Sequence, residues 1–197
     1  MRYPSGLIRE RLLQTATELF LERGYEGTSM MEVSARAGGS KQTLYNHFSD
    51  KSALFSAVML HSIEAIGPAP ADLLEGEEPL LMRMSRFANA RFAQVARPFA
   101  LSLRRVLLAD AIRIVEGPRL HGLFFVAPWA PVAARFEAMI ARGDLKPGCS
   151  RLMAKHFRNL LEFEIMPQLV MGAPLDPDHD PAASAVDAFL SAYAARW

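Results

Sequence analysis

Two short helices joined by a tight turn constrain this chain more than any other feature. The run Ser29–Glu32 predicts a helix start, because the Ser hydroxyl and the Glu carboxylate of such a capping box each satisfy a free backbone N–H. The helix is expected to end where Gly38 and Gly39 favour a turn. Ser40 is placed to cap a second short helix, Lys41–Phe48. The pattern therefore predicts a helix-turn-helix.

Apolar residues at helical spacing extend this motif on both sides. Before it, the pattern predicts a helix over Ser5–Gly24, since glycine suits the left-handed residue that ends many helices. After it, Asp50 is expected to cap a fourth helix that reaches Gly67. Residues 1–50 are thus predicted to form a three-helix module, with a connecting helix over 51–67.

The remaining residues, 68–197, show helical periodicity and no competing strand pattern. The predicted helices are Pro79–Val95, Pro98 to about Val115, Leu123–Ile140, Leu152–Met171 capped by Ser150, and Pro181–Trp197. Because proline lacks an N–H and crowds the preceding turn, we expect a break or kink at Pro128 and Pro131 and a bend at Pro167. The predicted fold class is all-α, with a small N-terminal helix-turn-helix module and a larger helical C-terminal domain.

The overall charge neither requires nor excludes a nucleic-acid partner. The 22 Lys and Arg residues balance 21 Asp and Glu residues, which leaves a formal net charge of +1. Basic residues must therefore act locally if DNA is bound. The chain shows no nucleophile elbow, P-loop or dinucleotide-binding glycine motif, which predicts that it is not an enzyme and uses no cofactor.

Metal sites and membrane anchors are likewise not expected. Cys149 is the single cysteine, which excludes an intramolecular disulfide and a multi-cysteine zinc site. Asp176, Asp178 and Asp180 alternate like calcium ligands, but Pro181 stands where that loop needs glycine, so a solvated loop is expected. The N-terminus shows no signal segment, and the longest apolar stretch falls short of the roughly 18 to 20 residues that cross a bilayer. A cytoplasmic protein without a membrane partner is expected.

The second helix of the motif carries the side-chain types that read DNA. A helix-turn-helix lays this helix in the major groove, with its N-terminal residues against base edges. Lys41 suits guanine, and the amides of Gln42 and Asn46 suit adenine. Neighbouring side chains supply donors for phosphate oxygens, namely Thr43, Tyr45, His47 and Lys51.

Three stretches within Ile8–Met59 strengthen this interpretation: Ala16-Thr17-Glu18-Leu19-Phe20, Arg23-Gly24-Tyr25 and Ser40 to Phe48. Almost position for position, this run resembles the DNA-binding domain of the TetR-type bacterial transcriptional repressors. The resemblance implies a homodimer on a palindromic operator. It also implies a C-terminal pocket whose ligand releases the DNA.

The resemblance also assigns roles to individual residues. It puts base contacts on Lys41, Gln42 and Asn46, and phosphate contacts on Thr28 or Ser29, Thr43, Tyr45, His47 and Lys51. The family usually has valine or another apolar residue after the turn glycine, where this chain has Gly39. Losing that side chain removes a plug between the two helices and adds flexibility worth about 1 kcal/mol.

Aromatic and polar residues of the C-terminal domain are candidates for an effector pocket. A helix broken by proline near Trp129 packs less tightly than a regular one, which favours a cavity there. The candidates are Phe87, Arg104, Phe124, Phe125, Trp129, Phe136 and His156. For each ring the alternative is a plain place in the core. The expected effector is a small apolar or aromatic molecule.

The last two long helices are predicted to form a dimer interface. The first has more apolar surface than one buried face uses, and the second is rich in alanine, which lets helices approach closely across a two-fold axis. The candidates are Leu160, Phe163, Ala185, Phe189 and Ala192.

These features predict a dimeric, ligand-responsive transcriptional regulator, a repressor rather than an activator. Its partners are then a double-stranded DNA operator, a second copy of the chain and an unidentified small-molecule effector. The alternative is a small-molecule-binding helical scaffold whose helix-turn-helix is weakened or non-functional, given Gly39 and the balanced charge. Binding that weakens steeply with salt distinguishes the regulator from the scaffold.

Overall fold

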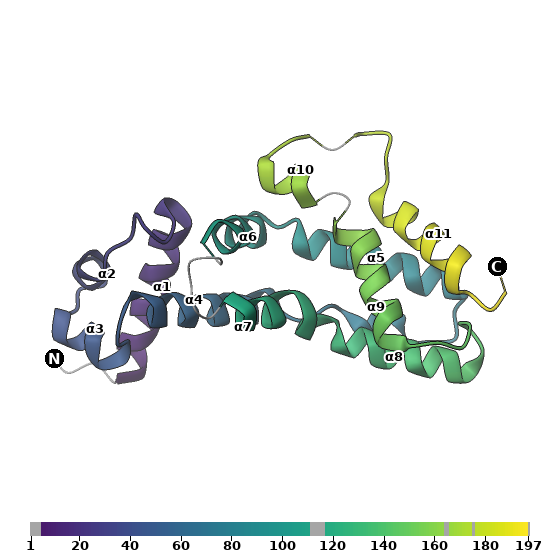
Figure 1. Ribbon diagram of the computed structural model, residues 1–197, viewed down its shortest axis with the longest axis horizontal. Helices are drawn as coiled ribbons and strands as arrows, with labels where there is room; N and C mark the ends of the chain where they lie inside the picture. Colours follow the sequence, from purple (N-terminus) through teal and green to yellow (C-terminus); the bar gives the residue numbers. More distant parts are fainter. Residues whose placement is uncertain (1–4, 111–116, 164–165, 175, 197) are drawn as a thin grey trace. The chain divides into compact units, whose positions relative to one another are not determined.

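Hydrogen-bonding side chains and left-handed glycines set the helix ends in the computed structural model, which describes residues 5–110, 117–163, 166–174 and 176–196. Within these residues the regular structure is helical, apart from an isolated bridge between Leu145 and Ala194 (Figure 1). The all-α prediction is confirmed. The chain separates into two units, one of residues 1–65 and 102–123 and the other of residues 66–101 and 124–197.

The first unit contains the predicted helix-turn-helix. Its helices are α1 (Ser5–Arg23), α2 (Met30–Arg36), α3 (Lys41–His47), most of α4 (Lys51–Ile66), the C-terminal part of α6 (Pro98–Asp110) and α7 (Gly117–His121). Gly24 follows α1 with φ +71°, the left-handed conformation that closes a helix. The sequence did not predict that residues 102–123 join this unit.

Three side-chain caps predicted from the sequence are present. The Ser29 hydroxyl accepts the N–H of Glu32 at 3.1 Å, and the Ser40 hydroxyl accepts the N–H of Thr43 at 3.0 Å. The Asp50 carboxylate accepts the N–H of Ala53 at 2.8 Å. The other half of the predicted capping box is different, because the Glu32 carboxylate pairs with Arg23.

The core of the first unit is formed where its helices meet. Leu44 and Leu54 are fully buried, as are Phe20 and Phe55, whose rings meet edge to face with centroids 5.0 Å apart. Tyr25, in the turn after α1, packs its ring against Phe55 at 5.2 Å. These contacts tie the turn between α1 and α2 to α4.

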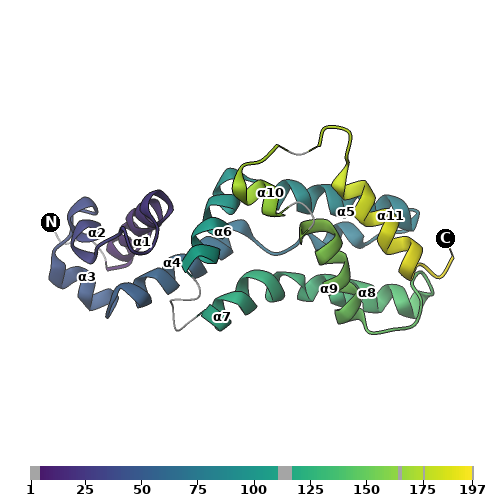
Figure 2. The same ribbon diagram turned by 45° about the horizontal axis from the view of Figure 1, so that its top comes forward.

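The second unit is a helical bundle of its own (Figures 1 and 2). It contains η1 (Ala71–Leu74), α5 (Leu80–Val95), η4 (Ala127–Trp129), α8 (Ala130–Arg142), α9 (Ser150–Arg158), η5 (Asn159–Phe163), α10 (Met166–Met171) and α11 (Pro181–Tyr193). The helix α9 packs against both α8 and α11, and α11 also packs against α5. The central rings of the core belong to Phe87, Trp129, Phe136, Phe157 and Phe189.

Proline breaks the predicted Leu123–Ile140 helix, as expected. A π-helical turn, η3 (Gly122–Val126), and the 3-10 turn η4 with Pro128 precede α8. Pro131 lies in the first turn of α8, where a missing N–H costs no helical bond, so Pro131 does not break that helix.

Other predicted boundaries shift. The predicted Leu152–Met171 helix is interrupted over Asn159–Phe163, before Pro167, by a π-helical turn. The N-cap of α9 is Cys149, whose side chain makes no capping bond, so the expected cap at Ser150 is wrong. The helix α11 ends at Tyr193, while Val115 and Trp197 lie outside the described residues.

Two stretches, Lys51–Leu74 and Gly117–Arg142, are long and apolar enough to cross a membrane by length and composition alone. The second contains Leu123–Ala134, the longest apolar stretch of the sequence, which by itself is too short to cross a bilayer. Core helices of other proteins pass the same test, and both stretches are interrupted. Regular α-helix ends at Ile66 in the first and at His121 in the second.

Gly39 and its neighbour Gly38 differ in backbone conformation, which allows a matched stability experiment. Gly39 has no positive φ, and a Cβ there would lie 3.9 Å from the Ser34 carbonyl oxygen, which is ordinary contact. Gly38 has φ +67°. We expect Gly39→Ala to raise the free energy of unfolding by about 0.4–1 kcal/mol, because alanine restricts the unfolded chain.

The control, Gly38→Ala, is expected to lower the free energy of unfolding by about 1–2 kcal/mol, because a Cβ is strained in the left-handed region. Both values come from chemical denaturation followed by circular dichroism. A destabilised Gly39→Ala variant would contradict the expectation.

Candidate nucleic-acid interface

The helix α3 has one buried face and one exposed face. Leu44 is fully buried, and Phe48, one turn further on, is 5% exposed. Residues three or four apart share a helix face, so burial of these two turns the side chains between them outward. The exposed residues of α3 are Lys41, Gln42, Tyr45 and Asn46. The three residues predicted to read bases therefore lie together on the solvent-facing side.

The exposed side chains of α3 are partly organised among themselves. The Gln42 amide donates to the Asn46 carbonyl oxygen at 3.0 Å, across one turn. The Lys41 ammonium lies 5.8 Å from the centroid of the Tyr45 ring. Each amide keeps further donors and acceptors for a base edge, because Asn and Gln both offer an NH2 group and a carbonyl oxygen.

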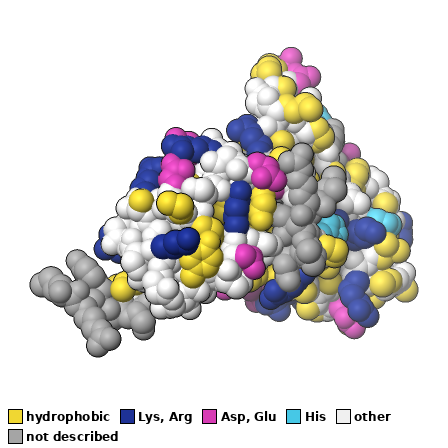
Figure 3. Space-filling view, turned by 60° about the vertical axis from the view of Figure 1, so that its left-hand side comes forward, with side chains coloured by type: hydrophobic (Ala, Val, Ile, Leu, Met, Phe, Trp, Pro, Cys, Tyr) yellow, Lys and Arg dark blue, Asp and Glu magenta, His cyan; other side chains and the backbone are white. Residues whose placement is uncertain are grey.

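The flanking residues predicted to hold phosphates have different degrees of access. The Lys51 ammonium lies 4.4 Å from the Tyr25 ring centroid and donates to the Glu26 carbonyl oxygen at 3.3 Å. Thr43 and His47 are half-buried, and Tyr45 is 41% exposed. Figure 3 brings the left-hand side of Figure 1 forward and shows Lys and Arg side chains interspersed with acidic and uncharged ones rather than gathered in one patch.

Thr28 does not fit the predicted phosphate role. Its side chain is 2% exposed, and its hydroxyl donates to the Gly24 carbonyl oxygen at 2.9 Å. The Thr28 hydroxyl is therefore buried away from a phosphate at the surface. Ser29, the alternative at this position, is exposed and its hydroxyl oxygen caps α2.

The turn glycine that departs from the family pattern is held by its neighbours. The N–H of Gly39 donates to the Ser34 carbonyl oxygen at 3.0 Å, and the Ser34 hydroxyl donates back to the Gly39 carbonyl oxygen at 3.0 Å. Arg11 adds a bond to the Ala37 carbonyl oxygen at 2.8 Å. Both backbone groups of Gly39 are thus satisfied although the plug is missing.

Two ionisable groups beside α3 have shifted pKa values. Burial raises the pKa of Tyr25, and the nearby Glu26 and Asp50 carboxylates raise it further. The pKa of Asp50 is lowered, first by the N–H of Ala53 and then by the hydroxyl of Ser49. Asp50 is therefore a carboxylate at neutral pH, when it caps α4.

The predicted pocket residues are placed differently from expectation. Phe87, Trp129 and Phe136 are at most 4% exposed and pack into the core of the second unit. The alternative, a plain place in the core, holds for these three. Phe124 is also buried, at 6%. Arg104 belongs to the first unit, apart from the other candidates.

The two remaining pocket candidates are half-buried. Phe125 accepts a hydrogen bond at its carbonyl oxygen from Arg158. The His156 ring is hydrogen-bonded through Nδ1 to the Tyr193 hydroxyl. Among the predicted pocket residues of the second unit, Phe125 and His156 are the two that keep part of their surface exposed to solvent.

A charged network that the sequence did not predict lies inside the second unit. Arg91 and Glu162 are 2% and 1% exposed and form an ion pair at 2.9 Å. The Trp129 indole N–H donates to the same Glu162 oxygen at 3.1 Å. Arg91 and Glu162 lie 71 residues apart in the sequence. The helical periodicity around each residue therefore gives no indication that the two form a pair.

The dimer candidates divide between surface and core. Ala185 and Phe189 are 1% and 0% exposed, and the Phe189 ring stacks on Phe136 with centroids 5.1 Å apart. They complete the core of their own chain, so they are removed from the candidate interface. Phe163 is 50% exposed, Ala192 is exposed and Leu160 is half-buried.

Comparison with known proteins agrees with this geometry. Residues 12–58 match the family model of bacterial regulatory proteins of the tetR family, and residues 82–195 match the model of an AefR-like transcriptional repressor C-terminal domain. A TetR-family transcriptional regulator from Mesorhizobium loti has a similar structure, with TM-score 0.82 and 28% identity. That similarity covers 98% of this chain and 100% of the other.

The flavonoid-responsive regulator FrrA is also similar, with TM-score 0.77 and 25% identity over 98% of this chain and 100% of that one. Among curated relatives, the transcriptional activator FasR of Mycolicibacterium smegmatis is 43% identical over 63 residues, 32% of this chain. The repressor DhaR of a Mycobacterium species is 38% identical over 52 residues, 26% of this chain. The matches span 29% and 26% of the lengths of FasR and DhaR.

A helix-turn-helix with an accessible polar recognition helix, joined to a helical second unit, defines a DNA-binding transcriptional regulator. With a C-terminal family model matching more than half of its length, the chain belongs to the TetR family. The relatives are transcriptional regulators and not enzymes, which confirms the prediction that the chain is not an enzyme.

The lowered pKa of Asp50 predicts a pH-dependent contribution to stability. The carboxylate cap stabilises the fold above the unfolded-state pKa and is lost as the pH falls through the lower folded-state pKa. We expect Asp50→Ala to lower the free energy of unfolding by about 1 kcal/mol at neutral pH, because alanine cannot cap the helix. Urea denaturation is expected to show the difference shrinking as the pH falls below about 4.

Asp50→Asn is the control, because asparagine also caps a helix but does not titrate. The free energy of unfolding of Asp50→Asn is expected to stay within about a few tenths of a kcal/mol of the wild-type value at neutral pH. A cost of Asp50→Ala that is unchanged at acid pH would contradict the capping role of the carboxylate.

Proposed function

We propose that this chain is a ligand-responsive repressor that binds a palindromic operator as a homodimer in the cytoplasm. The observation that carries the proposal is the exposed Lys41, Gln42 and Asn46 face of α3, opposite the buried Leu44. A helix presented in this way enters the major groove with its first turn against base edges. The AefR-like repressor model over residues 82–195 supports repression rather than activation.

The proposed division of labour follows the side-chain chemistry. Lys41 donates to guanine, and Gln42 and Asn46 pair with adenine. The predicted phosphate contacts are kept except for the buried Thr28. Phosphates are then held by Ser29, Thr43, Tyr45, His47 and Lys51. Lys51 supports this assignment because its ammonium is held at the α4 N-terminus over Tyr25.

The scaffold alternative is weakened by the state of the turn. Gly39 is held by two hydrogen bonds to Ser34, and Ser40 caps α3. The helix-turn-helix is therefore ordered without the apolar plug of the family pattern. Salt-dependent binding to DNA distinguishes the two functions, because only phosphate contact releases counterions.

The outer surfaces of α11 and of the α9–η5 segment are proposed as the dimer interface. Leu152 and Phe163 are 49% and 50% exposed although both are large and apolar. On α11, Ala188 and Ala192 are exposed small residues that allow close approach of a second helix. The proposed interface thus keeps the two helical segments that the sequence predicted. Within them, the exposed Leu152 and Ala188 take the place of the buried Ala185 and Phe189.

An aromatic effector is proposed for the second unit. FrrA responds to flavonoids, as its name states, and is similar over the whole of this chain. Phe125 supports an aromatic contact here, because its ring is half-buried while Phe87 and Phe136 are committed to the core. To release DNA, the effector must prefer the non-binding conformation, since equal affinity for both conformations shifts nothing.

The base-reading assignment predicts how the selected DNA changes on mutation. Gln42→Ala is expected to relax one position of the consensus selected from random DNA, at a cost of about 1–3 kcal/mol. Lys51→Ala is the matched control and should weaken all sequences alike, with a salt slope lower by about one. An unchanged consensus for Gln42→Ala would contradict base reading by this residue.

The interface assignment predicts a change of mass in solution. We expect the wild type to be a dimer by light scattering at micromolar concentration, and Phe163→Asp to be a monomer because it buries an unpaired charge. Met171→Asp is the control, since Met171 is 85% exposed but lies on α10. A monomeric wild type, or a dimeric Phe163→Asp variant, would remove this interface.

The effector assignment predicts a separation of DNA binding from release. Phe125→Ala is expected to bind the operator as the wild type does, yet to need at least tenfold more flavonoid for release, because it loses the aromatic contact. Fluorescence anisotropy of labelled operator gives both values. Phe99→Ala, another partly exposed ring, is the control. If the Phe125→Ala variant released the operator at the same flavonoid concentration as the wild type, the effector would not bind against Phe125.

A further inference from the structure

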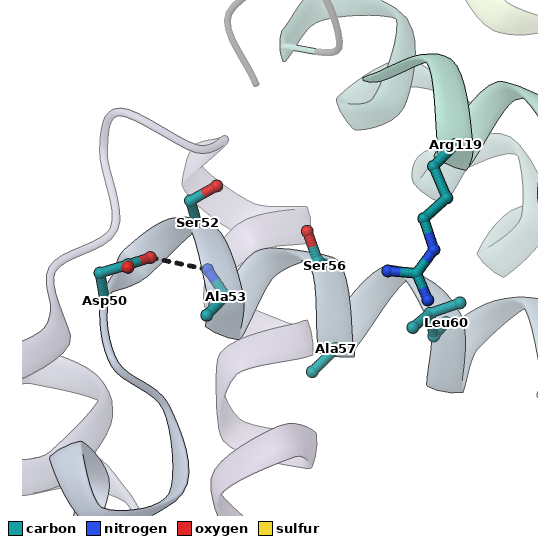
Figure 4. Close-up of a pocket in the computed structure, with 7 residues that line it drawn as sticks. All are labelled: Asp50, Ser52, Ala53, Ser56, Ala57, Leu60 and Arg119. Atoms are coloured by element: carbon teal, nitrogen blue, oxygen red, sulfur yellow. Dashed lines mark hydrogen bonds between the residues drawn. The ribbon is translucent and has the colours of Figure 1, made fainter. Parts of the chain in front are cut away.

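A pocket of about 560 Å³ lies within the first unit, between α4 and α7 (Figure 4). Its volume falls in the range of small-molecule sites. Its lining residues belong to the first unit, whereas the aromatic residues considered for the effector belong to the second. No role in DNA recognition was assigned to its central residues.

One side of the pocket is an apolar stripe along α4. Ala53, Ala57 and Leu60 line it, and with Ser56 they follow the i, i+3, i+4, i+7 spacing of a single helix face. All three apolar side chains are half-buried. The stripe is about 10 Å long at 1.5 Å per residue, which suits a short linear hydrocarbon.

Two polar groups reach the pocket from different helices. Arg119, on α7, directs its guanidinium toward Leu60, and Ser56 rises from α4 toward the same side (Figure 4). Ser56 is 8% exposed, and its hydroxyl has no hydrogen-bond partner. A buried hydroxyl without a partner is unfavourable, so an acceptor atom placed in the pocket would gain that bond.

The charges of the pocket orient a ligand. Arg119 offers a planar fork of N–H donors, the geometry that matches a carboxylate. Asp50 lies at the other end of the stripe, where its carboxylate is bound to the N–H of Ala53. A second negative charge at that end would be repelled, so the pocket favours a ligand with one anionic end and an uncharged tail.

We propose that this pocket binds a linear monocarboxylate, with the carboxylate on Arg119 and Ser56 and the hydrocarbon along Ala53, Ala57 and Leu60. This binding is independent of the aromatic effector. It requires neither DNA nor a second copy of the chain.

Isothermal titration of the full-length chain with octanoate tests the proposal. Saturable binding of one octanoate per chain is expected, with octan-1-ol at least tenfold weaker because it lacks the charge that pairs with Arg119. Arg119→Gln is expected to weaken octanoate at least tenfold. Arg151→Gln, a change of an exposed arginine on α9, is the control and should leave the affinity unchanged.

Two further variants separate binding from folding. Ser56→Ala removes a hydroxyl that has no partner in the fold, so thermal stability should not fall while octanoate affinity drops about tenfold. Ala57→Leu fills the stripe and should abolish binding with Arg119 intact. Equal affinity for octanoate and octan-1-ol, unchanged binding by Arg119→Gln, or no saturable binding by the wild type would overturn the proposal.

Discussion

Burial of Leu44 is the contact on which the DNA-binding geometry depends. Burial of an apolar side chain fixes the rotation of a short helix, and Leu44 with Phe48 settles which side of α3 faces solvent. The caps at Ser40 and Asp50 fix where α3 and α4 begin, so the exposed face has a defined first turn. Lys41 and Gln42 lie in that turn because of these local constraints together.

In the second unit, a buried ion pair lies beside the aromatic rings of the hydrophobic core. Arg91 and Trp129 converge on Glu162, so the carboxylate is stabilised by a charge and by a neutral donor. The rings of Phe87, Trp129 and Phe157 meet around this network. Phe87 and Trp129, which the sequence suggested as ligand contacts, therefore pack against one another in the core.

The helix α4 combines two features that belong to different kinds of recognition. Its N-terminal residue Lys51 lies beside Tyr25 at the proposed DNA surface, while Ser56 and Leu60 line a pocket roughly one and a half to two and a half turns further on. The pocket arises because alanine at two positions of the stripe leaves volume that larger side chains would fill. A single helix thereby offers a cation for a phosphate at one end and an apolar stripe for a hydrocarbon chain along its side.

The sequence by itself determined the local structure, including the all-α class, the caps at Ser29, Ser40 and Asp50, and the two-faced recognition helix. These follow from hydrogen bonds and periodicities that span only a turn or two of chain. Only the tertiary structure decided that Thr28 and Phe189 are buried, that Arg91 meets Glu162, and that α4 and α7 line one pocket. Each of these depends on which distant segment of the chain packs on a given helix. The spacing of side chains within one helix does not contain that information.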